Sequence, residues 1–207
     1  MARKAVTNPR KHASQDRSRA TVEALIEATA RLLVKDGFDK ASTNRIAEKA
    51  GVSVGSLYQY FPGKEALVAA VLERHSRELM EVVRRALAEV AALPMERAVR
   101  RLVAAAVEAH RIDPKLHRVL AEQIPRMGKL EGTEVLNRET WLLFRSWLET
   151  HRDEFRPVDL DLATFVCVTS IEALTHTAVL RQAENLPEEA FAALVDEATR
   201  LIVRYLE

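Results

Sequence analysis

Apolar residues recur at helical spacing through most of this 207-residue chain, and this feature constrains the fold more than any other. The first such stripe begins after about residue 17 and consists of Val22, Leu25, Ile26, Thr29, Leu32 and Leu33. Alternating runs rich in β-branched residues are hard to find, and the chain has only 6 glycines and 7 prolines. The sequence therefore predicts an all-α protein of about nine helices.

Caps and prolines divide this pattern into separate helices. Gly37 stands where a left-handed C-cap belongs, with Phe38 as its apolar contact. Asp113 precedes Pro114, and Pro157 precedes a capping Asp159. After the first helix, from about residue 17 to Gly37, these signals predict helices at about 42–50, 53–60, 64–92, 95–111, 114–124, 132–153, 159–183 and 187–206.

The two shortest of these segments form a helix-turn-helix pattern over residues 42–61. Ser42 or Thr43 can cap the first helix, Gly51 ends it, and Ser53 caps the second. Helices of about two turns are unstable alone, so the helix before them and the long helix after Pro62 must supply packing. Of the second helix, we expect Leu57 and Phe61 to face inward and the other side chains, Tyr60 included, to lie on the outer face or its edges.

Charge is unevenly distributed between the two ends of the chain. Residues 1–64 hold 12 basic and 6 acidic residues, a net +6, whereas the remainder holds 19 basic and 24 acidic residues, a net −5. A basic head on an acidic body is expected where only the head meets a polyanion. A basic, disordered tail that only keeps the chain soluble explains the same numbers equally well. Basic residues of the tail and of the start of the first helix either follow DNA phosphates and enter a minor groove or are simply solvated: Arg3, Lys4, Arg10, Lys11, Arg17 and Arg19.

The segment A-G-V-S-V-G-S-L-Y-Q-Y-F-P-G-K, residues 50–64, has features suited to the DNA major groove. Ser53 caps a helix whose free N–H groups can meet a phosphate, and Gly55 and Ser56 are small enough for close approach. Over residues 17–77, the strings R-I-A-E-K-A-G-V-S and S-L-Y-Q-Y-F-P-G-K-E-A-L resemble the TetR (tetracycline-repressor-like) family of transcription regulators. Residues 78–207 fit that family by length and helical content.

The resemblance implies a three-helix DNA-binding domain at 17–77, after a basic tail at 1–16, joined by a long helix to an effector-binding and dimerisation domain at 78–207. It also assigns contacts to phosphates and base edges, and these residues are Thr43, Asn44, Arg45, Ser53, Val54, Gly55, Ser56, Tyr58, Gln59, Tyr60 and Lys64. Asn44 stands where family members often carry arginine, and the second helix has no Arg or Lys. Recognition should therefore depend on close fit and DNA shape more than on charge.

The resemblance further implies a homodimer that binds a palindromic operator and responds to a small-molecule effector. The last two helices are the expected dimer interface, through Thr164, Val168, Ile171, Phe191, Leu194, Val195, Ala198, Ile202 and Tyr205, although burial within one subunit would give the same stripes. Polar and aromatic groups in apolar helices are candidate effector contacts, although each alone is also typical of a surface or core residue: His110, His117, Glu122, Gln123, Trp141, Trp147, Glu172 and His176.

No catalytic motif accompanies these features, so we expect neither an enzyme nor a bound metal or cofactor. Cys167 is the single cysteine, which excludes an intrachain disulfide and a cysteine-based zinc site. We expect no signal peptide or membrane span, and a bacterial cytoplasmic protein that associates with the nucleoid when bound to DNA. The function predicted is a ligand-responsive transcriptional repressor, and the alternative is an all-α protein-interaction adaptor. DNA affinity should fall steeply with salt, whereas an adaptor gives no such signature.

Overall fold

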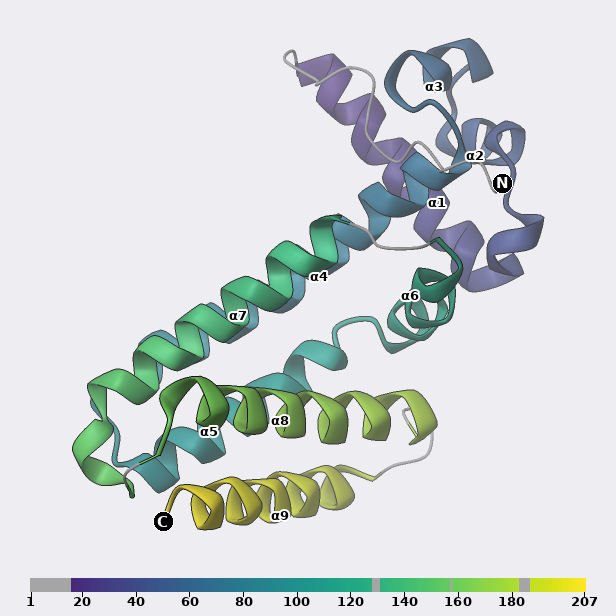
Figure 1. The fold of residues 1–207 in the computed structure, drawn as a ribbon. Coiled ribbons are helices and arrows are strands. Elements are labelled where there is room, and N and C mark those ends of the chain that lie inside the picture. Colours follow the sequence, from purple (N-terminus) through teal and green to yellow (C-terminus); the bar gives the residue numbers. More distant parts are fainter. Residues whose placement is uncertain (1–15, 128–130, 157, 183–186) are drawn as a thin grey trace. The chain divides into compact units, whose positions relative to one another are not determined.

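The computed structural model describes residues 16–127, 131–156, 158–182 and 187–207, with backbone alone at 16, 17, 123–127, 131–137, 181 and 182. Within those ranges the chain is helical and has no strand, as the sequence predicts. The helices, in order, are α1 (Asp16–Lys40), α2 (Thr43–Ala50), α3 (Val54–Tyr60), α4 (Lys64–Val90), α5 (Met95–His110), α6 (Pro114–Met127), α7 (Glu131–Thr150), the short 3₁₀ turn η1 (Arg152–Glu154), α8 (Leu160–Gln182) and α9 (Glu188–Leu206) (Figure 1).

The chain forms two compact units, one comprising residues 1–75 and 115–134 and the other residues 76–114 and 135–207. The sequence predicted a single division at residue 77. The extra segment, mostly α6, belongs to unit one because its Leu116 and Leu120 are buried in the core of that unit. The other members of that core come from α1 to α4 and include Leu25, Ile46 and Leu57.

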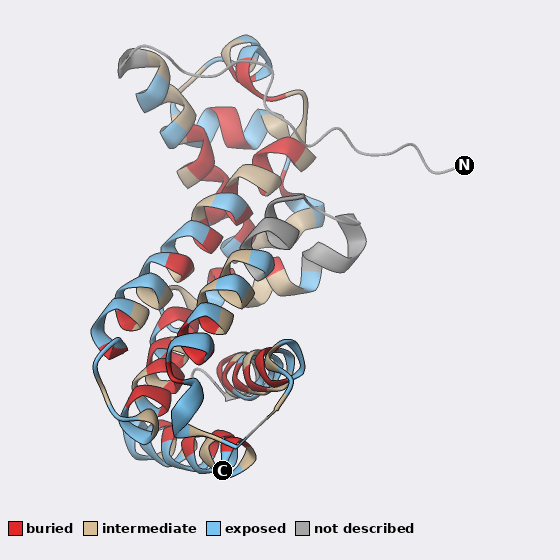
Figure 2. Ribbon diagram, turned by 60° about the vertical axis from the view of Figure 1, so that its left-hand side comes forward, coloured by how far each residue is buried: buried red, intermediate tan, exposed pale blue. Residues whose placement is uncertain are grey.

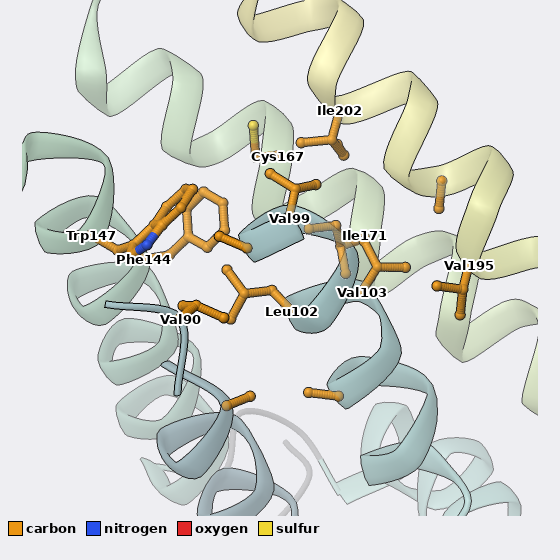
Figure 3. Packing of buried hydrophobic residues seen from close by; sticks show 14 of the residues in the cluster. Val90, Val99, Leu102, Val103, Phe144, Trp147, Cys167, Ile171, Val195 and Ile202 are labelled. Atoms are coloured by element: carbon orange, nitrogen blue, oxygen red, sulfur yellow. The ribbon is translucent and has the colours of Figure 1, made fainter. Parts of the chain in front are cut away.

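The core of unit two lies among α4, α5, α7, α8 and α9. Helix α5 packs against both α8 and α9, which also contact each other. Figure 3 shows Val99 and Val103 of α5 pointing toward Ile171 of α8 and Val195 of α9. Cys167 is fully buried in the same cluster, and burial raises the pKa of its thiol to about 12. The thiol is therefore protonated and unreactive at neutral pH, as suits a packing residue.

The helix ends follow the sequence signals closely, with one difference at Gly37. Asp159 Oδ1 accepts a hydrogen bond from the Leu162 N–H at 2.8 Å and so caps α8 as expected. Gly37 has the expected positive φ of 76°, but its ψ of 173° is outside the left-handed helical region. The residue therefore marks a kink, after which the helix continues to Lys40.

Helix α8 differs from the expectation that no segment could span a membrane. By length and composition alone, its residues Leu160–Leu180 are long and apolar enough to do so. A search for an unbroken apolar run misses this segment because threonines, serine and Glu172 interrupt it. Core helices of soluble proteins pass the same test, but only 33% of this window is buried in the subunit. A large part of an apolar helix is thus left uncovered by the chain itself.

Candidate functional site

The helix-turn-helix of unit one is held by two serine caps and a glycine turn. Ser42 Oγ accepts a hydrogen bond from the Arg45 N–H, and Ser53 Oγ accepts one from the Ser56 N–H at 3.0 Å. Gly51 has φ 70° and ψ 28°, and the N–H groups of Gly51 and Val52 donate to the carbonyls of Glu48 and Ala47. This is a Schellman motif, which requires the left-handed conformation that glycine adopts at low cost. The turn between α2 and α3 is therefore fixed by the backbone.

Helix α3 has an inner face and an outer face. Leu57 and Phe61 are fully buried in the core of unit one, as the spacing predicts. On the outer side, Tyr58 is 41% exposed, and Gly55 and Gln59 are also exposed. Ser53 is exposed as well, and Val54 and Ser56 are half-buried. A Cβ added at Gly55 would meet nothing closer than Ser53 Oγ at 3.8 Å, so the outer face has open space at this point.

Tyr60 departs from the expected arrangement. The sequence placed it toward the outer face or its edge, but its side chain is only 8% exposed and belongs to the hydrophobic core of unit one. The physical reason is helical spacing, because Tyr60 lies three residues after Leu57 and shares its inner side. Most of the ring is therefore unavailable to a partner.

The start of α2 lies within hydrogen-bond distance of the outer face of α3. Thr43 Oγ1 and Tyr58 Oη are 3.2 Å apart, and both residues retain solvent access. Asn44, the neighbour of Thr43, is also exposed. A hydroxyl pair at this distance orients the Tyr58 ring, so two helices jointly define the polar part of this surface.

Arg45 and Lys64 are positively charged groups that already have partners within unit one. The Arg45 guanidinium donates to the Lys40 carbonyl at 2.8 Å and to Asp36 Oδ2 at 2.6 Å. Lys64 Nζ donates to the Phe38 carbonyl at 3.0 Å and lies 3.9 Å from the centroid of the Phe38 ring. Both cations therefore fix the end of α1, and any contact with a phosphate must coexist with these bonds.

A basic groove between α1 and α2 was not identified from the sequence. Its lining includes Arg31, Lys35, Arg45 and Lys49, with Glu48 as the acidic member. Lys35 and Lys49 belong to different helices, 14 positions apart, so no local motif joins them. The excess of basic residues over residues 1–64 was the available signal, but it does not say which face the side chains share.

Unit two contains an apolar cavity of about 320 Å³ among α4, α5, α7 and α8. This volume lies at the lower end of the range for small-molecule sites. Among the predicted effector residues, the cavity is lined by His110, Trp141 and Glu172. The sequence missed the remaining lining residues, such as Leu79 and Phe165, because helical periodicity does not tell a core face from a cavity wall.

The other predicted effector residues do not line this cavity. Trp147 is buried in the core of unit two, where its ring stacks on His151 with centroids 4.7 Å apart. His176 lies edge-on to His110, at a ring distance of 5.4 Å. His117 belongs to unit one, where its Nδ1 is 3.0 Å from Nε2 of His75. Glu122 is exposed on α6, and the side chain of Gln123 lies outside the described residues.

Most residues expected at a dimer interface are buried within a single subunit. This holds for six of the nine, namely Thr164, Ile171, Phe191, Val195, Ala198 and Ile202. Ile171, Val195 and Ile202 lie in the core that these helices form with α5 (Figure 3), and Phe191 and Ala198 belong to the same cluster. Val168, Leu194 and Tyr205 are half-buried. Within one subunit, the buried side of these helices packs against the chain's own α5. Contact of their remaining surface with a second chain stays a prediction.

Two short capped helices on a small three-helix core define a helix-turn-helix DNA-binding protein, and the comparisons with known proteins agree. Residues 25–71 match the family described as "Bacterial regulatory proteins, tetR family". Residues 94–206 match "Tetracyclin repressor-like, C-terminal domain", which extends the likeness into the part of the chain where the sequence offered only length and helical content. The chain belongs to the TetR family of transcriptional regulators.

Individual relatives align over only part of the chain. The chain is 43% identical over 63 residues to the HTH-type transcriptional activator FasR of Mycolicibacterium smegmatis, a match that covers 30% of this chain and 29% of FasR. It is 40% identical over 50 residues to the HTH-type transcriptional repressor KstR of Rhodococcus jostii, covering 24% of each chain. The chain thus spans less than a third of the length of these curated relatives.

Solved structures extend the similarity of fold to nearly the whole chain. A putative TetR-family transcriptional regulator from Mesorhizobium loti superposes with a TM-score of 0.73 at 18% identity, covering 92% of this chain and 98% of that one. At this identity the likeness concerns the fold alone. The family models, by contrast, make the chain a helix-turn-helix transcriptional regulator. Its operator, assembly and effector have to be argued from its own residues.

Proposed function

We propose that this chain is a ligand-responsive repressor that acts as a homodimer on a palindromic operator. The observation that carries the DNA-binding part is the outer face of α3, where Gly55, Tyr58 and Gln59 are exposed above a rigid core. A helix with small residues on its outer face can approach base edges closely in the major groove. Two copies related by a two-fold axis then read two half-sites.

The proposed roles follow from exposure and chemistry. Val54, Gly55, Ser56 and Tyr58 meet base edges and thymine methyl groups, and Gln59 reads a base or the backbone. The remaining residues meet phosphates, with Asn44 also able to bond adenine, and they are Thr43, Asn44, Arg45, Ser53, Tyr60 and Lys64. For Tyr60 the proposal is limited to its hydroxyl, because the ring is buried.

The homodimer is supported by an uncovered face of α8. Leu162, Val166, Ser170, Ala173 and Thr177 recur at intervals of three or four, retain solvent access and carry no charge. Leu162 is 55% exposed, and on α9 Leu201 is 53% exposed. Buried and exposed residues recur at helical spacing along both helices, so each has a buried side and an exposed side (Figure 2). Exposed apolar surface of this extent on a lone subunit is typical of an interface.

The cavity in unit two supports the response to a ligand, because it is lined in part by α4. Leu79, Met80, Val83 and Leu87 of α4 face the cavity, while Leu67 and Val71 of the same helix are in the core of unit one. A ligand that favours one position of α4 therefore changes the spacing of the recognition helices in the dimer and releases DNA. It must bind the two states unequally to have this effect.

The experiment that tests this function is selection of double-stranded DNA from a random pool by the full chain. We expect enrichment of a palindrome whose half-sites lie about 34–36 Å apart, and affinity that falls steeply with salt. Gln59→Glu adds a negative charge to the exposed face of α3 and should abolish enrichment. Absence of any enriched sequence, together with flat salt dependence, would favour the protein-interaction adaptor. Loss of transcription from the selected site when the protein is added distinguishes a repressor from an activator.

A further inference from the structure

The lining of the cavity in unit two carries a single carboxylate and no lysine or arginine. Glu172 supplies the carboxylate, and the other polar groups are His110, Thr140 and Thr169. His110 Nδ1 lies 2.6 Å from the Ala106 carbonyl oxygen, a contact that requires a proton on this nitrogen. An anionic ligand would meet the negative charge of Glu172, and the lining has no lysine or arginine to offset it.

Glu172 is unusual within its own helix. It is the only Asp, Glu, Lys or Arg between Leu162 and Leu180. Across the described part of the chain, its carboxylate forms no ion pair, whereas the acidic residue at the start of α8, Asp161, is paired with Arg145 at 2.6 Å. The charge of Glu172 is thus available to a molecule that enters the cavity.

Aromatic rings accompany this carboxylate in the lining. Trp141 and Phe144 come from α7, and Phe165 from α8, where it is 59% exposed. Phe165, Thr169 and Glu172 are spaced by four and three residues, so they lie along one side of α8, and all three are exposed. They therefore mark the side on which the cavity opens to solvent. Aromatic faces attract cations through their quadrupole, most strongly in tryptophan.

We infer that the effector of this cavity is an organic cation with an apolar or aromatic body, held by Glu172 and the neighbouring aromatic rings. The inference rests on the proposed function, in which this cavity receives the effector, and it adds the chemical class of the ligand. A carboxylate and an aromatic wall favour the same charge, and the remaining apolar surface accepts the body of the molecule.

Two matched probes test the sign of the charge directly. Trimethyl(3-phenylpropyl)ammonium and 4-phenylbutanoate share a phenyl ring and a three-carbon linker but carry opposite charges. Neither changes charge near neutral pH, so the comparison is independent of titration. Binding to the full chain is measured by calorimetry and by the fluorescence of Trp141, with Trp141→Phe separating its signal from that of the buried Trp147.

We expect the cation to bind wild-type protein at least tenfold more tightly than the anion. Glu172→Gln keeps the size of the side chain and removes its charge, so it should weaken cation binding about five- to tenfold and leave anion binding unchanged or stronger. Trp141→Leu should weaken cation binding about two- to fivefold. The matched control is Glu189→Gln, which removes one exposed negative charge on α9 away from the cavity and should change neither affinity.

Equal or stronger binding of the anion, no binding of either probe, or insensitivity of cation binding to Glu172→Gln would each overturn the proposal. The affinity for the selected DNA, measured with and without each probe, separately tests the regulatory role of the cavity on which the proposal rests. If the cation binds through Glu172 but leaves the affinity for the selected DNA unchanged, the chemical class stands and the regulatory role of the cavity fails. If the anion binds and releases DNA, the regulatory role stands and the cation proposal fails.

Discussion

At the scale of single residues, Gly55 separates what the fold needs from what DNA binding needs. Its backbone has no positive φ, and a Cβ would meet only Ser53 Oγ at an ordinary van der Waals distance of 3.8 Å. Nothing inside the subunit therefore requires a glycine here. A glycine in a helix costs stability, so its presence on the outer face points to a requirement from outside the subunit.

We predict that Gly55→Ala leaves the free energy of unfolding unchanged or raises it by up to about 1 kcal/mol, because alanine favours helix. The same methyl group should weaken binding of the selected DNA by about 1–3 kcal/mol, because it intrudes on a close-packed interface. Thermal unfolding and fluorescence anisotropy measure the two effects. Gly51→Ala is the control, since φ of 70° makes it destabilising by about 1 kcal/mol. If Gly55→Ala binds the selected DNA as tightly as the wild type does, α3 does not lie in the major groove.

Lys64 is held to Phe38 by a hydrogen bond and a cation–π contact, so the charge of its side chain contributes to the stability of unit one. Lys64→Met keeps the aliphatic packing and removes the charge, so we expect a loss of about 1 kcal/mol in stability. If Lys64 also contacts a phosphate, affinity should fall for all DNA sequences and the salt slope should decrease by about 1. Lys115→Met, exposed on α6, is the matched control. If Lys64→Met keeps the wild-type salt slope, Lys64 contacts no phosphate and serves only to fix the end of α1.

At the scale of helices, the sequence predicted where elements begin and end better than which neighbour each face meets. The ends of α2 and α8 were predictable because Ser42, Gly51 and Asp159 act on backbone groups a few residues away. The inner face of α9 was also predictable, but its partner was not. Ile202 packs in the subunit core because α5 covers it, and a local pattern cannot distinguish that cover from a second chain.

This distinction changes how the dimer has to be tested. Deleting residues 187–207 would remove Phe191, Ile202 and Leu206 from the core of unit two, so loss of dimers would only report loss of structure. A substitution at an exposed position avoids that difficulty. Leu201 on α9 is 53% exposed and can accept a charge without burying it in the subunit.

We therefore predict that Leu201→Glu shifts the protein from dimer to monomer while the monomer keeps its helical fold, although the stabilisation supplied by dimerisation is lost. Placing two carboxylates in an apolar two-fold interface is unfavourable, because each charge loses water without gaining a partner. Sedimentation velocity measures the assembly and circular dichroism the fold. Leu142→Glu on α7, a site with similar exposure of 51%, should remain dimeric. Dimers that persist in Leu201→Glu would place the interface elsewhere.

At the scale of the whole molecule, α4 is the element common to both proposed activities. Its early residues Leu67 and Val71 are buried in unit one, and its later residues Met80 and Val83 line the cavity of unit two. A continuous helix transmits a displacement along its axis because its backbone hydrogen bonds resist bending. The cavity and the recognition helix are therefore linked through one covalent element, and their equilibria should be coupled.

Coupling of this kind is reciprocal. If the phenylpropyl cation weakens binding of the selected DNA by a given factor, expected within about 5- to 150-fold, that DNA must weaken binding of the cation by the same factor. Anisotropy and calorimetry measure the two sides independently. In Leu201→Glu the cation should still bind, since Glu172 and Trp141 are untouched, but a monomer has no spacing between recognition helices for the ligand to change. Coupling that survives undiminished in that monomer would mean that the ligand acts within a single subunit, through α4, on the helix-turn-helix itself.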